Sequence, residues 1–318
     1  MEQIIVPNVV LNSGHKIPNI GYGTGTVPLP PYEELFSAFT EAIQVGYRHF
    51  DTAAYYGSEE ALGHAIAHAL EQGVIKSRSE IFVTTKLWCT DANPGLVIPA
   101  LKKSLETLGL DYVDLYLIHF PVRLRQGIKG IQYHKGDILP FDMKGTWEDM
   151  EQCSELGLTK SIGVSNFGVR KLSELLQDAT ITPAVNQVEL NASWQQGDLR
   201  KFCKEKGIHV CAWSPLGANG AVWGSRAVID NPILKDIAIS TGKSVAKVAL
   251  RWIIQQGVTP IVKSFNKERM KENLQIFDFE LSEDDVEKTK QIPQHRAFRG
   301  ERFITDHGPF KTMEDLWD

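Results

Sequence analysis

Short apolar runs alternate with amphipathic stretches along this chain, and several of the runs end abruptly in a polar residue. Residues 49–51, 81–86 and 112–119 are rich in β-branched and aromatic side chains, a composition typical of buried strands. Between them, apolar residues return every three or four positions, as in residues 35–43, and Ser58 is placed to cap a second helical stretch. The pattern therefore predicts strands and helices that alternate along the chain.

Eight apolar runs, separated by helical segments, make up this alternating pattern. The other five runs span residues 19–23, 160–164, 184–189, 208–214 and 260–264. Further helical patterns cover residues 94–108, 145–155, 169–177, 198–206 and 244–256. This order predicts one α/β domain over residues 1–318, in which eight parallel strands close into a (β/α)8 TIM barrel. An N-terminal β-hairpin, with its turn at Asn12, Ser13 and Gly14, is expected to cover one end of the barrel.

Two long segments lie outside this repeat, residues 121–144 and residues 293–318. Both are too long to be simple connectors. The first directly follows His119 at the end of a predicted strand, where the loops of a barrel build the rim of the active site. We expect these two segments to be the loop and the tail that determine the substrate.

Composition and charge are those of an ordinary globular protein. With 318 residues, 42% of them hydrophobic, and a net charge of −5, the chain can bury a large core. Its basic residues are mixed with acids and no apolar stretch reaches the ~18 residues of a membrane span, so neither nucleic acid nor membrane is expected as a partner. Four scattered cysteines indicate a reducing compartment. We expect a cytoplasmic monomer that acts on a small molecule.

Two motif-like stretches are better explained without a ligand. Gly21, Gly23 and Gly25 imitate a dinucleotide fingerprint, but prolines follow where its helix should begin, so a Rossmann domain is not predicted. His64 and His68 lie one helical turn apart, but no third ligand accompanies them. We therefore predict no metal site.

Four polar residues near the strand ends offer proton-transfer chemistry. Asp51, Lys86 and His119 each close a predicted strand, and Tyr56 lies five residues after Asp51. A phenol with a pKa of about 10 needs a neighbouring cation to exchange a proton near neutral pH, and Lys86 can supply that charge. Asp51 would keep the buried lysine charged, and His119 would orient a carbonyl oxygen. The set predicts carbonyl reduction by hydride from a bound nicotinamide.

Each of these residues also has a structural explanation when it is considered alone. Asp51 could cap a helix, Lys86 could be a solvated strand end, and His119 could be a core histidine. Lys86 could also be the Schiff-base nucleophile of a lyase or aldolase, although Asp51 beside it favours a charged, non-nucleophilic amine. Their joint placement at successive strand ends favours the catalytic interpretation.

Several segments resemble the aldo-keto reductases, and the resemblance spans nearly the whole chain. They are Gly46-Tyr47-Arg48-His49-Phe50-Asp51-Thr52-Ala53, Lys86-Leu87-Trp88, Leu117-Ile118-His119, Gly163-Val164-Ser165-Asn166-Phe167, and Lys263-Ser264 with Arg269. The resemblance implies the barrel fold and a catalytic tetrad of Asp51, Tyr56, Lys86 and His119. In that tetrad Tyr56 is the general acid.

A phosphate-binding pattern follows the last predicted strand. Lys263, Ser264 and Arg269, at the start of a helical stretch, could meet a 2′-phosphate with ammonium, hydroxyl and guanidinium groups together. The family resemblance assigns the same stretch to the 2′-phosphate, and Glu272 and Asn273 to the adenine. The expected cofactor is therefore NADPH.

The nicotinamide end of the cofactor needs paired donors and acceptors at strand ends. The resemblance gives this role to Ser165, Asn166 and Gln187, and it places Trp213 against the nicotinamide ring. The full set of expected cofactor residues is Gly23, Thr24, Asp51, Ser165, Asn166, Gln187, Trp213, Ser214, Leu216, Lys263, Ser264, Phe265, Arg269, Glu272 and Asn273.

An aromatic pocket is expected for the substrate. Its predicted residues are Tyr22, Tyr55, Trp88, His119, Phe120 and Trp223, with Trp317 of the tail. Residues 130–147 and 306–311 resemble plant aldo-keto reductases that act on alkaloid, polyketide or sugar-acid carbonyls, codeinone, chalcone and galacturonate reductases among them. We thus expect a bulky ketone or aldehyde of plant specialised metabolism as the substrate. The alternatives are a cyclic imine reduced at the same site and a non-catalytic, nicotinamide-binding regulatory subunit.

Overall fold

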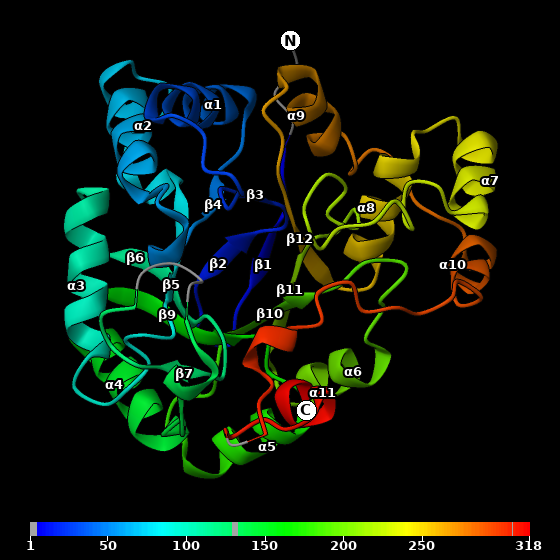
Figure 1. The fold of residues 1–318 in the computed structure, drawn as a ribbon. Coiled ribbons are helices and arrows are strands. Elements are labelled where there is room, and N and C mark those ends of the chain that lie inside the picture. The colour runs from blue at the N-terminus through cyan, green and yellow to red at the C-terminus, as the bar shows by residue number, and fades with distance from the viewer. Residues whose placement is uncertain (1–4, 129–132, 307) are drawn as a thin grey trace.

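Eight parallel strands form a closed barrel in the computed structural model, which describes residues 5–128, 133–306 and 308–318. Residues 129–132 of the predicted substrate loop and His307 of the tail lie outside the described residues. The barrel strands are β3 (Gly21–Gly23), β4 (His49–Asp51), β5 (Phe82–Leu87), β6 (Val113–Ile118), β9 (Thr159–Ser165), β10 (Val185–Glu189), β11 (His209–Trp213) and β12 (Val258–Val262). They lie at the centre of the molecule with the helices around them (Figure 1). The predicted barrel is confirmed, and all eight strands begin and end within two residues of their predicted bounds.

Helices separate the strands and cover the outside of the barrel. They are α1 (Tyr32–Val45), α2 (Glu59–Glu71), α3 (Val97–Leu108), α4 (Met143–Glu155), α5 (Val169–Asp178), α6 (Gly197–Glu205), α7 (Pro232–Thr241), α8 (Val245–Gln255), α9 (Lys267–Leu274), α10 (Glu283–Thr289) and α11 (Met313–Trp317). The sequence analysis missed α7, although Asn231 and Pro232 form a recognisable helix start. The side chain of Asn231 accepts the N–H of Leu234, and Pro232 fills the first helical position, where no donor is needed.

The core has two parts, one between the strands and the helices and one inside the barrel. On α1, the side chains of residues 35, 39, 42 and 43 are at most 2% exposed and face the strands, as their spacing predicts. Inside the barrel, Leu11 and Ile17 of the N-terminal hairpin pack on Phe82 and Leu115. Full burial of a side chain such as Ile17 stabilises the fold by roughly 1.5–3 kcal/mol.

The predicted hairpin covers the amino ends of the barrel strands. It pairs β1 (Asn8–Val10) with β2 (Lys16–Pro18), antiparallel. This end of the barrel is therefore closed by apolar side chains, which leaves the carboxyl ends of the strands as the open side.

The two segments outside the repeat contain structure of their own. In the loop after β6, β7 (Arg123–Leu124) pairs with β8 (Ile138–Leu139), a short ribbon that the sequence did not predict. The tail ends in α11, which lies against the start of α5, where the carboxylate of Asp318 accepts the N–H of Arg170 (Figure 1). The described parts of both segments thus fold back onto the barrel.

His64 and His68, which lie one turn apart on α2, each have an aromatic partner. His64 is hydrogen-bonded to Tyr32, and His68 packs edge-on against Phe36. Across residues 5–128, 133–306 and 308–318, no three His, Cys, Asp or Glu side chains come together as a metal-binding group. Among the helices of the same described ranges, none has both the length and the apolar character needed to span a membrane.

Candidate active site

Adjacent strands deliver the predicted catalytic side chains to one end of the barrel. Asp51 is the last residue of β4, Lys86 lies near the end of β5, and His119 directly follows β6. Because β4, β5 and β6 are parallel neighbours in register, their carboxyl ends meet, and alternate side chains point into the barrel. Tyr56 reaches the same place from a single 3₁₀ turn, Ala54–Tyr56, after β4. We call Asp51, Tyr56, Lys86 and His119 the catalytic floor.

A buried ion pair lies at the centre of the catalytic floor. The Nζ of Lys86 donates to Oδ1 of Asp51 at 2.6 Å and to the carbonyl of Thr52 at 3.0 Å, and both side chains of the pair are at most 4% exposed. Burial lowers the pKa of Lys86, but the charges of Asp51 and Tyr56 and the hydrogen bonds with them together outweigh it, so the pKa lies above its usual value. Lys86 is therefore an ammonium at neutral pH, which contradicts the alternative of a Schiff-base nucleophile.

The hydroxyl of Tyr56 lies between the two other polar groups of the floor. It is 3.5 Å from Nζ of Lys86 and 3.4 Å from Nε2 of His119. Burial raises the pKa of Tyr56, and the opposing effect of Lys86 only partly compensates. The charge of Lys86 acts in the direction that the sequence analysis expected, but burial has the larger effect on this pKa. The phenol is protonated at neutral pH, which suits a proton donor.

His119 is held as a neutral ring. It is 6% exposed, and burial together with the nearby Lys86 charge keeps its pKa well below the usual value. Its ring stacks on Phe120, with 5.1 Å between centroids, and meets Trp88 edge-on. Nδ1 of His119 and Nε1 of Trp88 are buried without a hydrogen-bond partner among the residues that the structure describes. Two such polar atoms beside one cleft fit a site that receives a polar ligand.

Buried hydroxyl groups hold the turn that carries Tyr56. Ser58 does not cap α2 as predicted, because its hydroxyl bonds those of Thr24 at 2.8 Å and Thr52 at 3.0 Å instead. The next residue, Glu59, is 6% exposed and accepts the hydroxyl of Thr85 at 2.6 Å. These contacts tie the turn to β3, β4 and β5. The sequence analysis missed them because it gave Ser58 a helix-capping role and Thr24 a cofactor role.

The residues expected at the nicotinamide come together beside the floor. The amide of Asn166 donates to the carbonyl of His119 at 2.9 Å, and its oxygen accepts from Nε1 of Trp213 at 3.1 Å. The hydroxyl of Ser165 donates to the carbonyl of Gln187 at 2.7 Å. Asn166 is held at φ 67°, a left-handed conformation that costs an L-residue about 1–2 kcal/mol and recurs at binding sites. A half-buried indole beside fixed amides fits a nicotinamide ring.

Gln187 makes a contact that the sequence did not predict. Its Nε2 donates to Oδ2 of Asp51 at 2.7 Å, and the side chain is buried. Asp51 is thus held by Lys86 on one oxygen and by Gln187 on the other. Gln187 links the expected cofactor residues to the ion pair of the floor.

The expected adenosine end lies in the loop after β12 and at the start of α9. Lys263, Phe265 and Arg269 are exposed there, and Nζ of Lys263 donates to the carbonyl of Gly25 at 3.0 Å. The N–H of Arg269 is capped by the side chain of Asn266, at 2.9 Å. Two cations beside a helix N-terminus fit a phosphate.

The other expected cofactor residues differ in their exposure and in their hydrogen-bond partners. Ser214 adopts φ 51°, Leu216 is half-buried, and Glu272 is exposed. Thr24 is 1% exposed, and its hydroxyl donates to the carbonyl of Asp51 at 3.1 Å. Asn273 is 7% exposed and bonds Tyr47 with its side chain. Gly23 and Ser264 are half-buried, and Ser264 bonds the backbone of Asn266.

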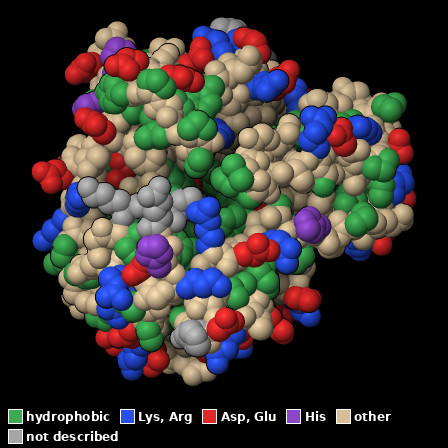
Figure 2. Space-filling view, viewed as in Figure 1, with side chains coloured by type: hydrophobic (Ala, Val, Ile, Leu, Met, Phe, Trp, Pro, Cys, Tyr) green, Lys and Arg blue, Asp and Glu red, His purple; other side chains and the backbone are tan. Residues whose placement is uncertain are grey.

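Aromatic side chains from distant segments surround the floor. Tyr55 stacks on Trp88 with 3.9 Å between ring centroids. A second group of rings, which we call the aromatic wall, meets Trp88 through Phe120 and consists of Phe120, Trp223, Phe298, Phe303 and Trp317. Hydrophobic side chains gather near the middle of the same face of the molecule (Figure 2). The sequence analysis missed Phe298 and Phe303, because only their contacts with Phe120 identify them.

Tyr22 does not belong to this pocket. Its side chain is 1% exposed and packs in the core against Phe39, Tyr47 and Phe50, and its hydroxyl donates to the carbonyl of Ser264. The alternation of β3 explains this placement, because neighbouring side chains point to opposite faces of the strand. The predicted substrate contact of Tyr22 is thus wrong.

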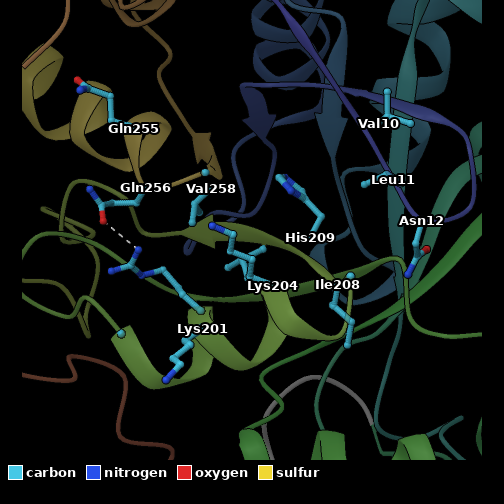
Figure 3. Close-up of a pocket in the computed structure, with 15 residues that line it drawn as sticks. Val10, Leu11, Asn12, Lys201, Lys204, Ile208, His209, Gln255, Gln256 and Val258 are labelled. Atoms are coloured by element: carbon cyan, nitrogen blue, oxygen red, sulfur yellow. Dashed lines mark hydrogen bonds between the residues drawn. The ribbon is translucent and has the colours of Figure 1, made fainter.

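A cavity of about 660 Å³ lies away from these residues, at the amino ends of β11 and β12. The hairpin contributes Val10, Leu11 and Asn12 to it, and Arg200 on α6 donates to Gln256 at 3.0 Å beside it (Figure 3). In barrels of this kind the chemistry takes place at the carboxyl ends of the strands. The catalytic floor, and not this cavity, is therefore the candidate active site.

Comparisons with known proteins agree with this geometry. The aldo/keto reductase family model matches residues 19–294. Rhazimal reductase 2 of Alstonia scholaris is 57% identical over 100% of this chain and 98% of its own length, and NADPH-dependent codeinone reductase 1-4 of Papaver somniferum is 52% identical over 100% and 99%. The crystal structure of a Bombyx mori aldo-keto reductase in complex with NADP, 37% identical, superposes with a TM-score of 0.86 over 96% of this chain and 99% of that one. The chain therefore belongs to the aldo/keto reductase family and is an NADPH-dependent oxidoreductase.

Proposed function

We propose that this enzyme reduces a bulky ketone or aldehyde to an alcohol, with Tyr56 as the general acid. The observation that carries the proposal is the placement of the Tyr56 hydroxyl, 3.5 Å from the Lys86 ammonium and 3.4 Å from the His119 ring. A carbonyl oxygen that enters this space meets the phenolic proton of Tyr56, the ring nitrogen of His119 and the positive charge of Lys86 together.

The catalytic floor supplies everything in this reaction except the hydride, which NADPH supplies when it is bound. His119, neutral and with its proton on Nε2, donates a hydrogen bond that orients the carbonyl oxygen. Tyr56 transfers its phenolic proton to that oxygen as negative charge develops there. Lys86 stabilises the resulting phenolate, and Asp51 keeps Lys86 charged.

NADPH would lie across the carboxyl ends of the last four strands. Asn166 and Ser165 would hold the carboxamide, and the ring of Trp213 would stack on the nicotinamide. Lys263 and Arg269 would bind the 2′-phosphate. The spacing of these groups over one edge of the barrel supports this orientation.

The substrate proposed here is a plant specialised metabolite with a large apolar skeleton. Two observations support it, the aromatic wall around the floor and the high identity to a rhazimal reductase and a codeinone reductase. Residues 121–144 and 293–318 would select the skeleton, because described side chains of both segments pack against Trp88 and Cys89, just after β5.

Tyr56→Phe tests the mechanism, since it removes the hydroxyl and keeps the ring. Purified protein is screened with NADPH against ketones, aldehydes and cyclic imines, and the substrate found is given to the variant. We expect a loss of about 1,000-fold or more in kcat, with NADPH affinity by fluorescence changed less than about twofold. Full turnover by the variant removes Tyr56 from the mechanism, and turnover of imines alone replaces the proposed carbonyl substrate.

A further inference from the structure

A buried carboxylate at the end of β10 touches the tail and not the reacting groups. Glu189 is 1% exposed, and its Oε1 and Oε2 accept the backbone N–H groups of Ala297 and Phe298, each at 3.0 Å. Glu189 lies two residues after Gln187, on the same face of β10, at the carboxyl end of the strand. Its side chain reaches the tail from there. Charge-assisted bonds of this kind are about twice as strong as neutral ones.

The groups that favour the charged form of Glu189 all belong to the tail. Burial raises the pKa of Glu189, and the N–H groups of Phe298 and Ala297 and the charge of Arg296 act against that rise. Arg296 lies over the ring of Trp317, 4.1 Å from its centroid. One residue earlier, the N–H of His295 donates to the carbonyl of Ser193 at 2.6 Å. The loop after β10 and Glu189 thus fix consecutive residues of the tail.

The residue that this anchor holds, Phe298, packs between Trp213 and other rings of the aromatic wall. The half-buried ring of Phe298 meets Trp213, the residue proposed to stack on the nicotinamide, edge-on at 6.0 Å between centroids. On its other sides the ring meets Trp223 at 6.2 Å and Phe120 at 6.0 Å. The position of the Phe298 ring therefore sets the space between Trp213 and the other rings of the aromatic wall.

We propose that Glu189 is a positioning residue for substrate choice, which fixes the backbone of Ala297 and Phe298 and so sets the position of the Phe298 ring beside Trp213. The kinetic part of this inference rests on the proposed function, because it requires a carbonyl substrate between these rings. A bulky aryl ketone must fit against Phe298. A three-carbon aldehyde reacts at the floor without reaching that ring.

The test uses Glu189→Gln, which keeps the shape of the side chain. The new NH₂ group faces one of the two backbone N–H groups, so one bond is lost and a buried donor is left unpaired. The chain offers a matched control in Glu151→Gln. Glu151 is 8% exposed and accepts the N–H groups of Thr180 and Ile181 at 2.8 and 2.7 Å, just before the amino end of β10.

Two measurements compare the variants with the natural protein. Amide hydrogen exchange at residues 297 and 298 should become about tenfold faster in Glu189→Gln and stay unchanged in Glu151→Gln. The ratio of KM for 2-acetonaphthone to KM for propanal, with NADPH saturating, should change at least about threefold in Glu189→Gln only. An unchanged exchange rate, an unchanged ratio, or an equal change in both variants overturns the proposal.

A double-mutant comparison shows whether Glu189 acts through Phe298. Adding Glu189→Gln to Phe298→Ala should leave the KM ratio of Phe298→Ala unaltered, and a further change contradicts the proposed route. If Glu189→Gln does not fold, Glu189→Asp, which is too short to reach both amides, takes its place in both measurements. If the natural protein reduces neither probe, the proposed function fails, and the exchange rates alone decide whether Glu189 holds the tail.

Discussion

The catalytic floor and the aromatic wall are neighbours in space but are built in different ways. The floor consists of side chains on or beside three adjacent strands, and its ion pair is at most 4% exposed. The wall is assembled from the loops after β6 and β11 and from the tail, and Trp223 is 36% exposed. Strand register fixes the floor, whereas the wall depends on loops that must be held down by separate contacts. The floor is suited to chemistry that stays the same, and the wall is suited to a substrate that differs between relatives.

The largest effect is expected from breaking the ion pair of the floor. Lys86→Met leaves the carboxylate of Asp51 buried without its cation, which should lower the free energy of unfolding by about 3–5 kcal/mol. Urea unfolding followed by tryptophan fluorescence measures this loss. The double variant Lys86→Met with Asp51→Asn should recover part of it, because no unpaired charge remains. Equal stability of the natural protein and Lys86→Met would show that the pair does not hold the floor.

The floor could be predicted from the sequence because its signals are local. Asp51, Lys86 and His119 each follow a β-like run, and parallel strands of a barrel bring such ends together. The wall gave weaker signals. Phe120 was expected among the aromatic residues of the pocket, but Phe298 depends on the path of a tail that is anchored by Glu189, more than a hundred residues away. No short-range pattern encodes such a contact.

Tyr22 shows that the sequence can also assign a residue to the substrate pocket wrongly. An aromatic residue in the first barrel strand was taken for part of the substrate pocket, yet it lies in the core at 1% exposure. Composition alone does not tell which face of a three-residue strand is turned inward. Where the strand was longer, as in β5 or β6, the alternation was sufficient to place the side chains correctly.

Acid should lower the free energy of unfolding through His49, a buried histidine inside the barrel. His49 is 1% exposed, and burial lowers its pKa to about 4. In the unfolded chain His49 binds a proton below pH ~6.5, and the folded protein does not, so stability is lost as the pH falls from about 6.5 to 4, by roughly 3 kcal/mol. Urea unfolding between pH 7 and 4 should be less pH-dependent in His49→Gln. Parallel curves for the two proteins would contradict the assignment.

A smaller effect is expected at the exposed end of the cofactor site. Arg269→Ala keeps the capped backbone of α9 but removes the guanidinium, so NADPH should bind about ten- to a hundredfold more weakly and NADH almost as before. Fluorescence titration with both cofactors measures this. Lys271→Ala, on the same helix and paired with Glu268, is the matched control. Equal weakening of both cofactors by Arg269→Ala refutes the phosphate assignment.

The smallest effect is expected at the rim of the wall, where it separates the two regions most clearly. Trp223 meets Phe298 edge-on at 6.2 Å, and an aromatic pair of this kind contributes about 0.5–1.5 kcal/mol, so Trp223→Ala should raise KM for a bulky ketone about two- to tenfold. Its kcat should stay the same, because no group of the floor contacts the indole. Leu156→Ala, which truncates another exposed apolar side chain at the end of α4, should change neither parameter. A fall in kcat with unchanged KM would mean that the wall takes part in the chemistry and that the division between the two regions does not hold.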